Sequence, residues 1–114
     1  MADDLSQARL AENEVLYRTV NEHIEDVNMA FEELTSLAGE WICECADTSC
    51  TTPVSATIEE YESVRADPHT FIVAPGHVNR ESEHVVRGNE RFTVVEKEGE
   101  AAEVAELHDA RKHL

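Results

Sequence analysis

The sequence predicts an α+β fold: a long N-terminal helix that packs on, or extends from, a small antiparallel sheet, with a short middle helix and a C-terminal helix. Residues 4–38 contain neither proline nor glycine, and their apolar side chains recur with helical spacing. From Gly39 onward the pattern changes to short β-branched and aromatic runs separated by turn residues. An N-capping sequence at Thr57 and a weak apolar face after Gly99 predict the two shorter helices.

The predicted N-terminal helix has an apolar seam with a seven-residue repeat. Its a positions are Leu10, Tyr17, Ile24 and Phe31, and its d positions are Asn13, Val20, Val27 and Leu34. Such a repeat is typical of helices that pack along one another. Gly39 stands where a helix C-cap belongs. A helix of this length would extend roughly 45–50 Å, more than the rest of the chain can cover, so we expect part of the seam to contact a partner helix in a homodimer.

The sequence pattern of residues 39–114 predicts a small α+β unit, which we expect to form one compact domain with the helix of residues 1–38. The predicted strands are residues 41–45, 70–74, 84–87 and 91–97, with a loop at 46–52, a turn at Pro75-Gly76 and a hairpin turn at Gly88-Asn89-Glu90. The middle helix begins after Thr57, which forms a capping box with Glu60, and Asp67-Pro68 ends it. The C-terminal helix covers residues 100–114.

The charge of the chain excludes several classes of partner. There are 25 acidic and 9 basic residues, which gives a formal net charge of −16. A nucleic-acid backbone or an anionic membrane surface requires a basic face, so a protein partner with a basic surface is the alternative that remains open. The acidic N-terminus has no apolar signal segment, and no apolar run reaches the ~20 residues of a membrane span. We expect a cytoplasmic protein.

Three cysteines lie within eight residues, in the spacing Cys43-x-Cys45-x4-Cys50. In an extended segment, alternate residues point to the same side, so Cys43 and Cys45 can face one ion, and the following loop can bring Cys50 back to it. An odd number of cysteines in a reducing compartment fits a metal site better than a set of disulfides. The alternative interpretation is three small buried side chains.

A structural zinc site is tetrahedral and needs a fourth ligand. His77 is the candidate, because it follows the Pro75-Gly76 turn, which can present an imidazole rigidly at a sheet edge. His69 and His84 are the alternatives. His23, His108 and His113 lie on predicted helices and are interpreted as solvated. The cofactor prediction is therefore Zn²⁺, bound by Cys43, Cys45, Cys50 and His77.

No catalytic constellation can be found in the sequence. A nucleophilic cysteine needs an electropositive environment, whereas Glu40, Glu44 and Asp47 surround these thiols. The predicted function is therefore a non-enzymatic, zinc-stabilised protein-interaction or regulatory protein. The alternatives are a thiol-based redox or metal sensor that releases zinc on oxidation, and a small metal-dependent hydrolase.

Four stretches resemble a family of small uncharacterised bacterial proteins, chiefly actinobacterial, that carry a C-E-C-x4-C signature and a downstream P-G-H motif. The similar stretches are Trp41 to Asp47 with Cys50, Glu60 to Pro68, Phe71 to His77 and Val94 to Ala101. The resemblance implies that the three cysteines and His77 belong to one site, and it implies no activity.

Overall fold

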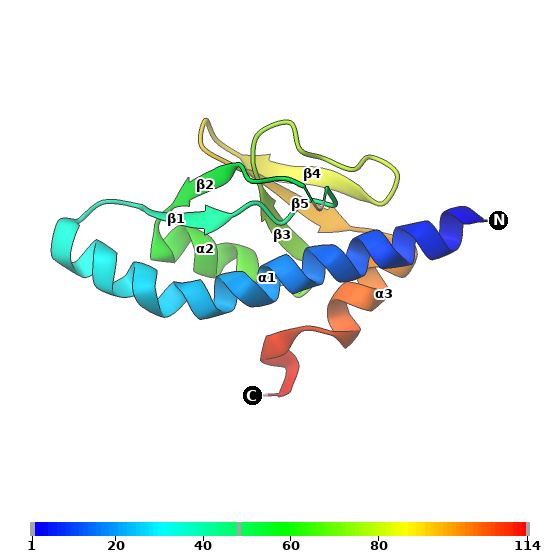
Figure 1. The fold of residues 1–114 in the computed structure, drawn as a ribbon, viewed down its shortest axis with the longest axis horizontal. Coiled ribbons are helices and arrows are strands. Elements are labelled where there is room, and N and C mark those ends of the chain that lie inside the picture. Colours follow the sequence, from blue (N-terminus) through cyan, green and yellow to red (C-terminus); the bar gives the residue numbers. More distant parts are fainter. Residues whose placement is uncertain (1, 48, 114) are drawn as a thin grey trace.

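The computed structural model describes residues 2–47 and 49–113, with the side chains of residues 11–47 and 49–111, and it has the predicted α+β architecture (Figure 1). In chain order the elements are α1 (Ala2–Thr35), β1 (Gly39–Ile42), β2 (Pro53–Ala56), α2 (Ile58–Arg65), β3 (Thr70–Val73), β4 (Glu83–Gly88), β5 (Thr93–Lys97), α3 (Gly99–Leu107) and the 3₁₀ helix η1 (Ala110–His113). Figure 1 shows α1 extending along the molecule, whose longest dimension is 50 Å, with β1 near its C-terminal half and α3 near its N-terminal half. Within the described residues, every helix is too short or too polar to cross a bilayer.

The strands form two antiparallel sheets where the sequence predicted one. The second sheet, in the order β3-β5-β4, contains the predicted hairpin of β4 and β5. The first sheet pairs β1 with β2, a strand to which the sequence analysis assigned no element. β2 has only four residues and begins at Pro53, so its local preference for a strand is weak. Its pairing with β1, rather than its own sequence, defines it.

The core lies between the β3-β5-β4 sheet and the helices. Its fully buried apolar side chains include Tyr61, Val64, Phe71, Ile72, Val73, Val94 and Val95. The predicted capping box is confirmed, since the Glu60 N–H donates to Thr57 Oγ1 (3.1 Å) and the Thr57 N–H donates to Glu60 Oε1 (2.8 Å). It starts α2 so that Tyr61 stacks on Trp41 of β1, with ring centroids 3.9 Å apart. This contact joins the small sheet to the core.

The prediction that Gly39 caps the long helix is wrong. α1 ends at Thr35, and Ser36 adopts the left-handed conformation (φ 59°) that follows the last turn, with its N–H bonded to the Glu32 carbonyl at 2.7 Å. Gly39 is the first residue of β1, where a Cβ atom would lie 2.6 Å from the Asn28 side chain. The glycine therefore permits the close approach of β1 to α1.

The face of α1 that packs on the domain is polar. Asn21 accepts a hydrogen bond from the Ile42 N–H and donates one to the Ile42 carbonyl, and Asn28 donates to the Glu40 carbonyl. These side chains satisfy the edge of β1 that does not pair with β2. Arg18 donates to the Ala105 carbonyl (2.9 Å), and its guanidinium lies 4.1 Å from the centre of the Phe71 ring. The predicted heptad seam is therefore divided: Val27, Phe31 and Leu34 are exposed, whereas Ile24 is half-buried against the core. The side chain of Leu10 lies outside the described residues.

A buried ion cluster that has no signal in the sequence pattern joins α1 to the second sheet. The Lys97 ammonium, at the end of β5, bonds to the carboxylates of Glu14 on α1 and Glu83 on β4, and all three side chains are inaccessible to solvent. One lysine cannot neutralise two carboxylates. Burial, opposed by the charge of Lys97 and reinforced by that of Glu83, raises the pKa of Glu14 from its ordinary value of 4.5 to about 8.

Replacing Glu14 with glutamine should weaken the pH dependence of stability. Between pH 4.5 and about 8 the folded chain keeps a proton on Glu14 that the unfolded chain releases. The contribution of this group to the free energy of unfolding is therefore complete below pH 4.5 and is lost as the pH rises through about 8. Urea unfolding measures the free energy of unfolding at intermediate and at alkaline pH. The decrease between the two pH values should be smaller in Glu14→Gln than in the wild type. Equal losses would mean that Glu14 titrates normally.

Candidate metal centre

Two loops bring the four predicted ligands together. Cys43 follows the last residue of β1, and the chain continues beside the end of β3, where the Glu44 N–H donates to the Ile72 carbonyl at 2.9 Å. The Ala74 N–H donates to Cys43 Sγ at 3.1 Å. Immediately beyond, Gly76 adopts a positive φ of 85° in the predicted turn, and the His77 N–H donates to the Ala74 carbonyl at 3.0 Å. The turn thus holds the imidazole opposite the cysteines.

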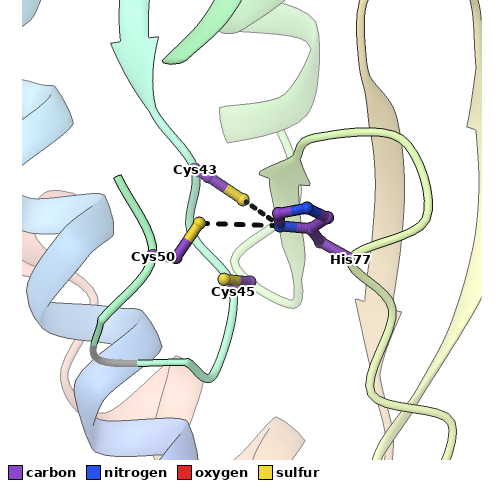
Figure 2. A group of neighbouring side chains, drawn as sticks. All are labelled: Cys43, Cys45, Cys50 and His77. Atoms are coloured by element: carbon purple, nitrogen blue, oxygen red, sulfur yellow. Dashed lines mark hydrogen bonds between the residues drawn. The ribbon is translucent and has the colours of Figure 1, made fainter. Parts of the chain in front are cut away.

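The ligand atoms form one tight group. The three sulfurs and one nitrogen of Cys43, Cys45, Cys50 and His77 all lie within 4.8 Å of one another. Figure 2 shows the cysteines arranged on one side of the imidazole ring, whose Nδ1 lies 3.5 Å from Cys43 Sγ and 3.5 Å from Cys50 Sγ. All three thiols are free of disulfide bonds.

The two sulfur-to-nitrogen distances fit a tetrahedral metal ion. Zinc binds sulfur at about 2.3 Å and nitrogen at about 2.0–2.1 Å, which places two such ligands about 3.6 Å apart at a tetrahedral angle. Both of these distances, 3.5 Å, are close to that separation. Thiolate and imidazole are also ligand types that select zinc or other soft metals over magnesium or calcium. The Cys3His group is therefore geometrically suited to hold a metal ion.

Glu44, between the first two cysteines, is fully buried and points away from the site. Its carboxylate accepts hydrogen bonds from Asn21 Nδ2 (2.7 Å) and from the Ile72 N–H (2.9 Å). Burial raises its pKa to about 7, against the lowering effect of these bonds. Glu44 therefore connects the cysteine segment to α1 on one side and to β3 on the other.

From the sequence, Glu44 is interpreted only as an acidic neighbour of the thiols. The orientation of Glu44 was nevertheless predictable, because alternate side chains of an extended chain point to opposite sides. If Cys43 and Cys45 point to one side, Glu44 must point to the other. Its role is to position the cysteine segment rather than to surround the thiols with charge.

Burial, rather than acidic neighbours, is the main influence on the pKa values of the two buried thiols, Cys43 and Cys45. Burial raises the pKa of Cys43 and of Cys45 above the ordinary value of a thiol. Burial also acts to raise the pKa of Cys50, but hydrogen bonds from the backbone and side chain of Thr52, together with those involving Cys45 and Cys43, outweigh it and lower the pKa. Cys50 is also the one cysteine that is not fully buried. A metal entering the site would thus displace protons from at least two protected thiols.

A shallow cleft of about 310 Å³ lies next to the site, lined by Cys45, Ala46, Asp47, His77, Val78 and Asn79. The carboxylate of Asp47, which is exposed, accepts hydrogen bonds from the Ser49 hydroxyl and N–H and so shapes the loop between the second and third cysteines. The cleft provides a path by which an ion can reach the sulfurs.

The other histidines lie elsewhere. His69 faces Glu106 and Asp67, and His84 faces Glu98 and Glu96, so each alternative ligand has carboxylate partners instead of cysteines. His23 and His108 are exposed, in agreement with their interpretation as solvated residues, and the side chain of His113 lies outside the described residues. Of the described histidines, His77 alone joins the cysteines.

Comparison with known proteins found no matching family model, no matching curated protein and no matching solved structure. The resemblance to the actinobacterial-type proteins therefore stays an expectation. The functional interpretation depends on the geometry of the site.

Proposed function

We propose that this chain is a non-enzymatic protein-interaction or regulatory protein whose fold is stabilised by Zn²⁺ bound to Cys43, Cys45, Cys50 and His77. The observation that supports it is the convergence of four soft ligand atoms within 4.8 Å. Three thiolates and one neutral imidazole around Zn²⁺ carry a net charge of −1 and fill the four positions of a tetrahedral ion.

The number of ligands favours a structural role over a catalytic one. A catalytic zinc keeps one position for water, whereas structural sites are filled by four protein ligands. Here the four side chains come from two loops, one after β1 and the other after β3. An ion bound between them links the small sheet to the large one, a contribution that a chain with 5% aromatic residues can use.

The partly exposed Cys50 favours one alternative, a redox sensor. A sensor cysteine is accessible and readily ionised, and Cys50 is the cysteine of this site that approaches that description. Cys43 and Cys45 are buried, which protects two of the three thiolates. We therefore favour the structural role, and peroxide-driven release of zinc from an otherwise folded chain would favour the sensor instead.

Metal analysis tests the proposed function. The purified, reduced protein should contain one zinc per chain, and His77→Ala should lower the affinity more than about a hundredfold, because loss of even an outer-shell partner costs 10–100-fold. His84→Ala is the matched control, since His84 lies in a neighbouring segment and pairs with carboxylates. Chains that bind no zinc, or equal affinities of the two variants, would contradict the proposal.

A further inference from the structure

The outer face of α1 is an apolar stripe that faces away from the domain. Its members are Leu16, Val20, Val27, Phe31 and Leu34, which we call the outer stripe. With 100° per residue, all five lie within about 40° of Val27 around the helix. Ala11, Glu14, Arg18 and Asn21, which are buried against the domain, lie on the opposite side. Apart from the half-buried Val20, the stripe is therefore left exposed by the packing of its own chain.

The exposure of this stripe is large for a monomer. Val27 is 68% exposed, Leu34 85%, Leu16 57% and Phe31 41%. Together these side chains present roughly 500 Å² of mostly apolar surface, at the upper end of what monomeric proteins expose. Paired with a copy of itself, the stripe would bury about 1,000 Å², the lower limit of a specific interface.

The charge pattern selects the partner. The chain has a net charge of −16, yet the outer stripe contains no acidic residue. Every glutamate or aspartate of α1 between positions 16 and 34 lies about 100° or more from Val27 around the helix. A basic partner would be expected to bind a face lined with carboxylates, whereas this face includes His23 but no carboxylate and repeats at heptad spacing, as in helices that pair with one another.

We propose that the outer stripe of α1 binds the outer stripe of a second copy of this chain. This names a partner for the interaction role proposed above, but it depends on α1 alone and not on the metal. The interface is a helix pair centred near Val27, with the two domains on the outside. The Asn21 and Asn28 contacts to β1 hold each helix in the orientation that keeps its stripe outward.

Sedimentation equilibrium of the zinc-loaded chain tests the pairing. The wild type should show a two-chain mass with a Kd in about the micromolar range. Val27→Asp and Leu34→Asp should each weaken the association at least about thirtyfold, because each places two desolvated charges in the interface. Met29→Asp is the matched control: Met29 is 50% exposed on the same helix, on the side away from the stripe, and its variant should keep the wild-type mass.

Salt dependence separates this partner from a basic one. Screening reduces the repulsion between two acidic chains, so higher salt should strengthen the self-association. Metal content, measured on the same samples, should be equal in all variants, which separates a failure of the pairing from a failure of the metal site. The thermal unfolding midpoints of Val27→Asp and Leu34→Asp should fall no further than that of the wild type diluted below its Kd, because only the stabilisation by the second copy is lost. A one-chain mass for the folded wild type at high concentration and high salt, or equal weakening by Met29→Asp, would overturn the proposal.

Discussion

Removal of the metal should lower the thermal unfolding midpoint of the reduced protein by about 15 °C or more. A site that binds metal at about 1,000 times its Kd stabilises the folded chain by about 4 kcal/mol, and in a domain of this size 1 kcal/mol corresponds to about 4 °C. The physical reason is that the loops after β1 and β3 meet at the four ligands. Calorimetry of zinc-loaded and chelator-treated protein measures the difference.

Cys43→Ser provides the internal control for this experiment. Without one inner thiolate the variant should unfold near the temperature of the chelated wild type, and chelation should change it little. Glu40→Ala, with an exposed side chain on β1, should behave like the wild type. If the chelator leaves the midpoint of the wild type unchanged, the ion has no structural role.

Glu44→Ala should destabilise the zinc-loaded protein by about 2–3 kcal/mol. The substitution leaves the Asn21 side-chain amide and the Ile72 N–H without their buried acceptor. Because the same carboxylate orients the cysteine segment, zinc affinity should also fall, as expected for a residue that positions a ligand from outside the coordination sphere. Chemical unfolding and a competitive zinc titration measure the two effects.

Glu44→Gln separates the shape of this side chain from its charge. Glutamine keeps one acceptor oxygen, so it should retain more stability and more zinc affinity than alanine. Unchanged zinc affinity in both variants would show that the cysteine segment holds its conformation without Glu44.

Local sequence signals were sufficient for most elements of the fold. The capping box at Thr57, the turn at Gly76 and the hairpin of β4 and β5 each depend on neighbouring residues, and each is present. β2 was missed because its pairing with β1 is not encoded within its own four residues. Gly39 was misassigned because the need for glycine at this position comes from a tertiary contact, the close approach of the Asn28 side chain, and not from its neighbours in the sequence.

The candidate ligands could be predicted from the sequence, but the residues that hold them in position by hydrogen bonds could not. Cysteines clustered in sequence and a histidine after a proline-glycine turn are local features, and the structure brings them together. The supporting residues come from elsewhere: Asn21 lies on α1, and Ile72 and Ala74 lie on or beside β3. The ion cluster of Glu14, Glu83 and Lys97 likewise joins three separate elements, and in the sequence each of its members reads as a surface charge.

X-ray absorption at the zinc edge tests the central claim most directly. For the reduced, zinc-loaded chain we predict a four-coordinate ion with three sulfurs at about 2.3 Å and one imidazole nitrogen at about 2.0–2.1 Å. In His77→Ala the imidazole signal should disappear while the three sulfurs remain. A shell with fewer than three sulfurs, or an imidazole signal that persists in His77→Ala, would contradict the Cys43, Cys45, Cys50 and His77 site.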